Sequence, residues 1–171
     1  MSDVGIILML LGVCAKNKWR LPFIEDMEKV GLDKSLFFNP VLPDGVPWSE
    51  EARLAEEKAK AEADYLVFYL GNTYDVEGAG NTLPFYSGCE VWDALINDRD
   101  RTVVILDYKD LSGHPLKQLK GMEALLLKNF DRDRIFTDQM KARRFFAKEV
   151  VRILQSRIAK MTQTLQKIRF E

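Results

Sequence analysis

The sequence predicts an α/β fold with three layers, in which helices cover both faces of a mostly parallel sheet of about five strands. The first observation is a set of short runs rich in apolar residues, which is typical of strands buried on both faces. The second is that segments with helical periodicity alternate with these runs, as in βαβ units. The runs are Gly5–Leu11, Ser35–Phe38, Tyr65–Leu70 and Arg101–Asp107, with a short edge strand at Arg134–Phe136.

The first half of the chain contains two predicted helices. Lys18–Val30 has apolar residues at helical spacing, and Gly31 is a suitable end for that helix. Asn39–Trp48 contains three prolines and predicts a shaped loop. Ser49 is a suitable cap for a helix over Ser49–Ala63, whose first turn is acidic.

The second half continues the alternation. A glycine-rich loop, Gly71–Asn81, precedes a helix that we expect to begin at Thr82, with Pro84 in its first turn. Leu116–Lys128 predicts another helix, and Asp138 caps a long final helix that remains regular to about Gln166.

At 171 residues the chain has the length of one domain, with an α/β core over residues 1–137 and a C-terminal helix over 138–169. The arrangement is expected to be flavodoxin-like or Rossmann-like. The apolar stripe on the last helix is longer than one small domain usually covers, so we expect a homo-oligomer. The stripe consists of Phe145, Phe146, Val150, Ile153, Leu154, Ile158 and Met161.

Composition and charge narrow the classes of function. A net charge of −1 gives no overall electrostatic case for nucleic acid or an anionic membrane. The apolar opening Val4–Val13 is shorter than a membrane span and lacks a basic leader, and the two cysteines form no disulfide framework, so we expect a cytoplasmic protein. No P-loop or GxGxxG fingerprint is present, and the single histidine, His114, argues against a metal centre or a serine triad. We expect no cofactor.

Carboxylates remain as candidate chemical groups. Asp64, Asp75, Glu77, Glu90 and Asp107 are expected at or near the end of the sheet where the loops form a cleft. Two acids in unlike environments can act as nucleophile and proton donor, as in the cleavage of glycosidic bonds. A solvated glutamate and a helix-capping aspartate are the structural alternative, and the pattern alone leaves both interpretations open.

Four segments together resemble the nucleoside 2-deoxyribosyltransferase family, particularly its compact transferase-like branch. The segments are LGVCAKNKWR after the opening strand, FFNPVLPD, ADYLVFYL and FYSGCEVWDAL, and the resemblance covers roughly Val4 to Leu106. It implies an enzyme in which Glu90 attacks C1′ of a 2′-deoxynucleoside and forms a covalent glutamyl-deoxyribosyl intermediate. The sugar then passes to a second, free nucleobase or to water.

The resemblance also implies roles for other residues. Asp64 is expected to contact the base or manage its proton, and Tyr86 and Ser87 to flank the nucleophile. Substrate-binding roles are further expected for Gly12, Trp19, Asn39 and Asp44.

The sequence departs from this family at two places. Leu10 and Leu11 stand where well-studied transferases carry a tyrosine, and Asn81–Pro84 stands where they carry an aspartate. Hydrolysis of the N-glycosidic bond of a nucleoside or nucleotide needs neither residue and is the nearest alternative. A non-catalytic nucleotide-binding module on the same fold is the alternative from another class.

Overall fold

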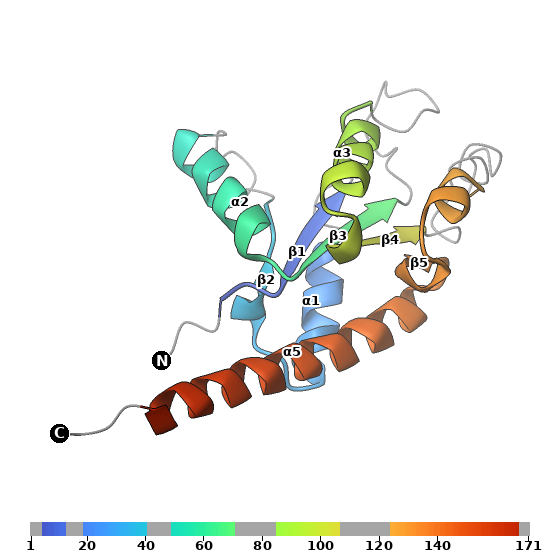
Figure 1. Cartoon of the computed structure of the whole chain (residues 1–171). Coiled ribbons are helices and arrows are strands. Elements are labelled where there is room, and N and C mark those ends of the chain that lie inside the picture. Colours follow the sequence, from blue (N-terminus) through green and yellow to red (C-terminus); the bar gives the residue numbers. More distant parts are fainter. Residues whose placement is uncertain (1–4, 13–18, 41–48, 71–84, 107–123, 168–171) are drawn as a thin grey trace.

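The computed structural model describes residues 5–12, 19–40, 49–70, 85–106 and 124–167, and over 85–89 it describes the backbone alone. Five strands and four helices alternate along this part of the chain (Figure 1). The strands are β1 (Leu8–Gly12), β2 (Phe37–Phe38), β3 (Tyr65–Leu70), β4 (Thr102–Leu106) and β5 (Ile135–Phe136). The helices are α1 (Arg20–Lys29), α2 (Glu50–Glu62), α3 (Phe85–Asn97) and α5 (Gln139–Lys167); residues 124–129 are also helical.

The strands form one parallel sheet in the order β2-β1-β3-β4-β5. In the longest pairing, Leu8 of β1 lies beside Tyr65 of β3 and Gly12 lies beside Tyr69. This strand order is that of flavodoxin-like folds, so the predicted three-layer α/β/α class is confirmed.

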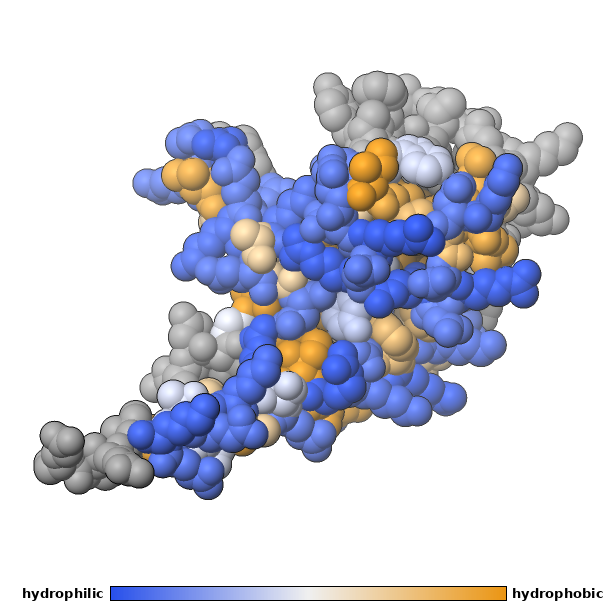
Figure 2. Space-filling model, in the orientation of Figure 1, coloured by the Kyte–Doolittle hydropathy of each residue, from blue (hydrophilic) through white to orange (hydrophobic). Residues whose placement is uncertain are grey.

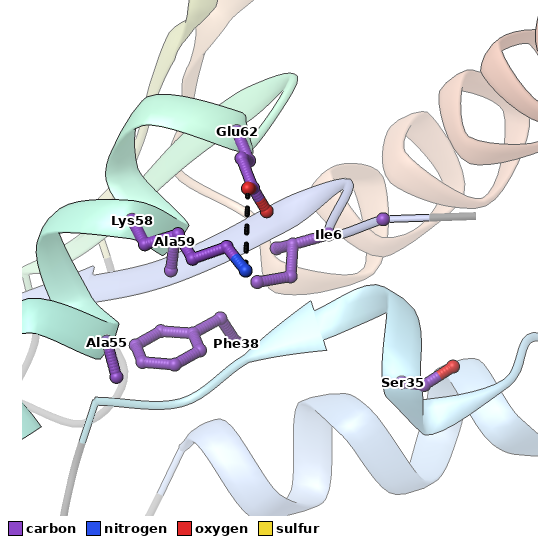
Figure 3. Close-up of a pocket in the computed structure, with 8 residues that line it drawn as sticks. Ile6, Ser35, Phe38, Ala55, Lys58, Ala59 and Glu62 are labelled. Atoms are coloured by element: carbon purple, nitrogen blue, oxygen red, sulfur yellow. Dashed lines mark ion pairs between the residues drawn. The ribbon is translucent and has the colours of Figure 1, made fainter. Parts of the chain in front are cut away.

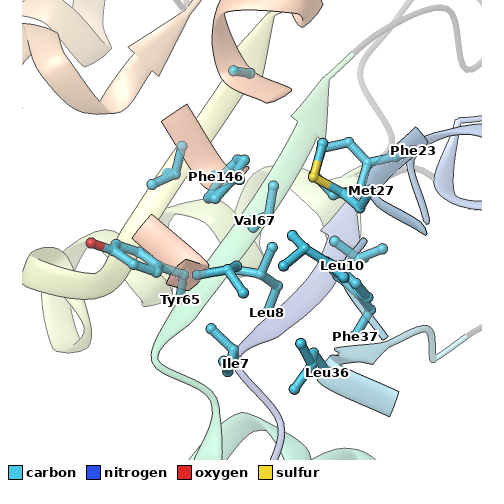
Figure 4. Packing of buried hydrophobic residues seen from close by; sticks show 14 of the residues in the cluster. Ile7, Leu8, Leu10, Phe23, Met27, Leu36, Phe37, Tyr65, Val67 and Phe146 are labelled. Carbon is cyan, nitrogen blue, oxygen red and sulfur yellow. The ribbon is translucent and has the colours of Figure 1, made fainter. Parts of the chain in front are cut away.

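One face of the sheet is covered by α1 and α5. Alternate residues of β3 point to this face, and Phe23 and Met27 of α1 and Phe146 of α5 pack against them (Figure 4). Phe146 is fully buried. The aromatic residues of this layer meet edge to face, with the Phe146 ring 5.8 Å from Phe23 and 6.1 Å from Tyr65.

The opposite face is covered by α2, α3 and the helical residues 124–129. Ala59 of α2, Val91 and Leu95 of α3 and Leu126 pack on the other set of strand residues, which includes Phe68. The small side chain of Ala59 is completely buried, which lets α2 approach the sheet closely. Because both faces are covered, the strands are apolar on both sides, as the unbroken run Tyr65–Leu70 predicts.

Local capping residues set the helix ends where the sequence predicts them. The Ser49 hydroxyl accepts a hydrogen bond from the backbone N–H of Ala52 at 3.2 Å, and the Asp138 carboxylate accepts one from Met140 at 2.8 Å. Gly31 ends α1 with a φ of 90°, a left-handed conformation that glycine adopts without steric cost. Its N–H donates to the carbonyl of Glu28.

Two strands begin more than one residue away from their predicted start. The first strand begins at Leu8 rather than Gly5, because Gly5 has a φ of 72° that breaks the extended conformation. Ser35–Phe38 is divided between a 3-10 turn, Lys34–Leu36, and the two-residue strand β2. The first part of the predicted helix Leu116–Lys128 lies outside the described residues.

The surface seen in Figure 2 is mainly hydrophilic, with small hydrophobic patches between charged side chains. Within the described ranges, no helix combines the length and the apolar character needed to cross a membrane.

Candidate active site

The strand order places a topological switch point between β1 and β3. From β1 the chain turns to α1 and β2 on one side, and from β3 it turns to α3 and β4 on the other. Open α/β sheets bind ligands outside the carboxyl ends of the strands at such a point. The described residues nearest to this point are Gly12 at the end of β1 and Trp19 and Arg20 at the start of α1. The N-terminal ends of α2 and α3 lie at the same edge of the sheet, because each helix follows a strand that ends there.

An ion pair connects α2 with α3. Lys60 of α2 forms an ion pair with Asp93 of α3, with Nζ 3.2 Å from Oδ2. Glu56 lies one turn before Lys60, and Glu90 lies one turn before Asp93. Both helices follow a strand that ends at the carboxyl edge, so these earlier turns are closer to that edge. Glu56 and Glu90 therefore lie closer to that edge than the ion pair does, and the charge of Glu56 acts on Glu90; we call these two residues the acid pair.

The environment of the acid pair favours protonation. Burial raises the pKa of Glu90, and the negative charge of Glu56 raises it further, while Lys60 and Arg20 act in the opposite direction. Burial also raises the pKa of Glu56, again opposed by Lys60 and Arg20. Glu90 is exposed to solvent on one side, so its desolvation is only partial. The negative charge of Glu56 therefore favours the protonated form of Glu90 relative to an isolated glutamate.

Arg20 supplies a fixed positive charge behind this pair. Its side chain is only 1% exposed, its Nε donates to the carbonyl oxygen of Leu10 at 3.1 Å, and its guanidinium lies 5.0 Å from the centre of the Trp19 ring. A buried guanidinium held by a strand carbonyl and an aromatic face cannot move far. Its positive charge lowers the pKa of both Glu56 and Glu90, although the arginine itself is buried and does not face solvent.

We expect Glu56→Gln to lower the pKa of Glu90, because the substitution removes the neighbouring negative charge. Carboxyl ¹³C chemical shifts of Glu90 followed through a pH titration measure this change. Glu57→Gln changes the next residue of the same helix and is the matched control. For this variant we expect the pKa of Glu90 to stay within about 0.2 units of wild type, which is small beside the variation of about 1 unit among glutamates in proteins. Lys60→Gln is expected to shift the titration in the opposite direction. An unchanged Glu90 titration in Glu56→Gln would show that the two carboxyls do not interact.

The structure does not bring Asp64 to this site, which corrects the expectation drawn from the sequence. Asp64 directly precedes β3 and lies at the amino edge of the sheet, and its carboxylate forms an ion pair with Arg157 of α5. Burial raises the pKa of Asp64 against the lowering effect of Arg157. Glu90 belongs to the opposite, carboxyl edge. Asp64 and Glu90 therefore lie at opposite edges of the sheet, and the ion pair with Arg157 joins Asp64 to α5.

We expect Asp64→Asn to change kcat/KM of the proposed reaction by less than about twofold. Its effect on the free energy of unfolding is expected to stay below about 1 kcal/mol, because both side chains of the ion pair remain about one third exposed and desolvation offsets their attraction. Urea denaturation and a kinetic assay on the same preparation check both values. A loss of turnover of more than about tenfold in Asp64→Asn would return Asp64 to the candidate site.

The other predicted site residues divide into four groups. Gly12 ends β1 beside Tyr69, and Asn39 lies half buried directly after β2, so both occupy the carboxyl edge. Trp19 is 8% exposed and stacks on Tyr69 with ring centroids 4.8 Å apart, in the core layer of α1 and α5. Asp44 lies outside the described residues. Tyr86 and Ser87 lie on the first turn of α3, of which only the backbone is described.

A separate hollow lies between α2 and the edge strand β2. It has a volume of about 240 Å³ and is lined by Phe38 of β2, Ala55 and Ala59 of α2, and Ile6 (Figure 3). Lys58 and Glu62 pair across one side of it, with Nζ 3.8 Å from Oε1. The hollow adjoins the edge strand and not the acid pair, so it adds nothing to the candidate active site.

Among the described residues of the site, the carboxyl groups of Glu56 and Glu90 are the candidate chemical groups. Among the residues that the structure describes, no group of histidine, cysteine and carboxylate side chains is arranged to hold a metal ion. Comparisons with known proteins add no relative, since no family model, curated protein or solved structure matches the chain significantly.

Proposed function

We propose that the protein transfers 2-deoxyribose between nucleobases by cleaving the N-glycosidic bond of a deoxynucleoside or deoxynucleotide. The observation that supports this proposal is the acid pair Glu56–Glu90 at the switch point of a flavodoxin-like sheet. Glu90 is also the residue to which the sequence resemblance assigns the nucleophile. The position of Asp64 leaves the second role to Glu56.

In the first step the Glu90 carboxylate attacks C1′, and an ester bond forms as the C1′–N bond breaks. The base leaves with the electron pair of that bond and takes the proton of the Glu56 carboxyl group. In the second step a nitrogen of another base attacks C1′, the ester bond breaks, and Glu90 regains its charge. Glu56 accepts the proton that the attacking nitrogen loses, so the pair returns to its starting state.

The coupling between the two carboxyls suits this cycle. Each negative charge disfavours ionisation of the other carboxyl group. The singly protonated form of the pair is therefore populated over a wider pH range than it would be for two independent glutamates. In the free protein the charge of Glu56 raises the pKa of Glu90, which favours its protonated form. The reactive form carries the proton on Glu56, and the base of the substrate, as proton acceptor, selects that form.

The test is chromatography of deoxynucleosides and deoxynucleoside monophosphates incubated with the protein, with and without a second free base. A new nucleoside that requires Glu90 supports the transferase. Free base and free sugar alone would identify an N-glycosidic hydrolase, which uses the same pair with water as acceptor. Binding without turnover in wild type would overturn the enzymatic proposal in favour of a nucleotide-binding module.

Acid quenching followed by mass spectrometry identifies the nucleophile independently of product analysis. We expect a mass increase of one deoxyribosyl group on the peptide that contains Glu90. A label on the peptide that contains Glu56 would exchange the two roles.

A further inference from the structure

A series of side-chain contacts joins the start of α5 to Arg20, the buried cation near the acid pair. It begins at Gln139, the first residue of α5, whose side-chain amide donates to the Tyr69 hydroxyl at 3.1 Å. The Tyr69 ring stacks on the Trp19 ring with 14° between the two planes, and the Arg20 guanidinium lies 5.0 Å from the centre of the Trp19 ring. Tyr69, Trp19 and Arg20 are all buried. We call Gln139, Tyr69 and Trp19 the Arg20 brace.

The orientation of the Gln139 amide follows from its contact with Arg143. The guanidinium of Arg143, one turn later on α5, donates to Gln139 Oε1 at 3.2 Å. Because a guanidinium has donors and no acceptor, the amide turns its oxygen to Arg143 and its NH₂ group to Tyr69. Arg143 also forms an ion pair with Asp26 of α1. The beginning of the brace is therefore tied to both helices that cover this face of the sheet.

The Trp19 ring is held by packing. Among the residues that the structure describes, no acceptor meets its buried indole N–H, so no hydrogen bond there sets the direction of the ring. Phe23, one turn later on α1, meets the ring edge to face at 6.1 Å, and Tyr69 covers its face at 4.8 Å. Both arrangements are favoured for aromatic pairs. Within the described part of the chain, the direction of the Trp19 ring therefore depends on Tyr69 and Phe23.

We propose that Tyr69 and Gln139 are positioning residues, which hold the Trp19 ring and through it keep the Arg20 guanidinium at the switch point. Arg20 Nε donates to the carbonyl oxygen of Leu10, two residues before the end of β1. This hydrogen bond fixes one atom of the guanidinium, and the Trp19 ring limits where the rest of the group can lie. The inference rests on the proposed function to the extent that the acid pair is the site that Arg20 serves.

The position of Arg20 matters because its charge acts on the nucleophile. Glu56 and Lys60 of α2 also act on Glu90. Lys60 pairs with Asp93 of α3 and is at the surface, whereas Arg20 is buried and depends on the brace for its place. A guanidinium that moves away from the acid pair lowers the pKa of Glu90 less, so that pKa rises. More of Glu90 is then protonated at a given pH and cannot attack C1′.

The order parameter of the Arg20 Nε–H bond, from ¹⁵N relaxation, measures the brace directly and needs no turnover. We expect a value near 0.85 in wild type, as for rigid groups, and below about 0.6 in Tyr69→Leu, which removes the stacked ring. Tyr65→Leu removes a buried ring from the same strand and the same face at the opposite edge of the sheet, and is the matched control with an unchanged value. A rigid Arg20 in Tyr69→Leu, or an equal loss in Tyr65→Leu, would overturn the proposal.

Gln139→Met tests the brace through a milder change. It removes the hydrogen bond to Tyr69 at a half-buried position and leaves every ring in place, so it remains informative if circular dichroism shows that Tyr69→Leu does not fold. We expect the Arg20 order parameter to fall, by less than in Tyr69→Leu. Gln155→Met makes the same substitution at an exposed position of α5 and is the control with no change. A wild-type order parameter in Gln139→Met would overturn the role of Gln139.

The titration of Glu90 and the pH profile of turnover connect the brace with the reaction. In Tyr69→Leu we expect the ¹³C titration of Glu90 and the acid limb of kcat to move together to higher pH by at least about 0.5 units, half the usual spread of glutamate pKa values. A general loosening of the fold would lower kcat at every pH without this shift. An unmoved Glu90 titration beside a mobile Arg20 would overturn the connection with the acid pair.

The two proposals fail in different measurements. If chromatography finds no turnover in wild type, the proposed function fails. The Arg20 order parameter and the Glu90 titration then still decide whether Tyr69 and Gln139 position Arg20. If turnover is found and Arg20 is equally rigid in wild type, Tyr69→Leu and Gln139→Met, the proposed function stands and the positioning role is overturned.

Discussion

Glu90→Gln is expected to lower kcat of deoxyribosyl transfer by about 10⁴-fold or more, the loss typical when an enzyme's nucleophile is removed. The amide keeps the size of the side chain and cannot form the ester with C1′. The residual rate would come from substrate positioning and from the proton of Glu56. Single-turnover kinetics with the substrate that chromatography identifies measures this loss directly.

The stability of Glu90→Gln separates this loss from misfolding. Because the pKa of Glu90 in the folded protein is raised, the folded state binds more protons than the unfolded chain, and ionisation of Glu90 destabilises the fold as pH rises through its folded pKa. The neutral glutamine lacks this cost, so the variant is expected to melt at least as high as wild type at pH 8. This advantage should disappear below about pH 4, near the pKa of an unfolded glutamate. Glu62→Gln, an exposed acid at the end of α2, is the control with unchanged turnover. A Glu90→Gln variant that retains more than a tenth of the wild-type kcat would exclude Glu90 as nucleophile.

Phe146→Ala is expected to lower the free energy of unfolding by about 3–5 kcal/mol. Phe146 of α5 is fully buried against α1 and β3. The centroid of its ring lies 5.8 Å from that of Phe23, 6.1 Å from that of Tyr65 and 5.2 Å from that of Phe145. Alanine would leave a cavity where three rings converge. Urea denaturation measures the loss, and the melting temperature is expected to fall by about 10 °C for a chain of this size.

Met140→Ala is the matched control for Phe146→Ala, because Met140 lies on the same helix and is 53% exposed. Its substitution is expected to change the free energy of unfolding by no more than about 0.5 kcal/mol. A loss below about 1 kcal/mol in Phe146→Ala would mean that α5 does not depend on this layer for its attachment to the sheet.

The elements that the sequence predicts most accurately are those with strong local signals. Tyr65–Leu70 matches β3 at both ends, because six consecutive buried residues suit only a central strand in this context. Ser49, Gly31 and Asp138 mark helix ends through their own hydrogen bonds or backbone angles, which depend little on the rest of the chain. The weak strands β2 and β5 have two residues each and depend on pairing with their neighbours.

The candidate site is harder to predict from the sequence, because it depends on contacts between elements that are far apart in the chain. Glu56 and Lys60 have the pattern of a solvated helix face, and only the packing of α2 beside α3 brings them to Glu90 and Asp93. Right-handed crossovers put α2 and α3 on the same face of the sheet, and this rule is the signal that points to their contact. The position of Asp64 away from the site is also predictable from the sequence. All strands of a parallel sheet begin at the same edge, and Asp64 directly precedes β3.

The two positive groups near the acid pair have different exposure, and this difference determines how dissolved ions affect the site. Lys60 is at the surface, with a side chain 40% exposed, whereas Arg20 is enclosed between β1 and Trp19. Mobile counterions screen an exposed ammonium group far more than a buried guanidinium. As ionic strength rises, the influence of Lys60 on the acid pair therefore fades while that of Arg20 remains. The enclosed arginine gives the two carboxyls an electrostatic environment that the composition of the surrounding solution changes only in part.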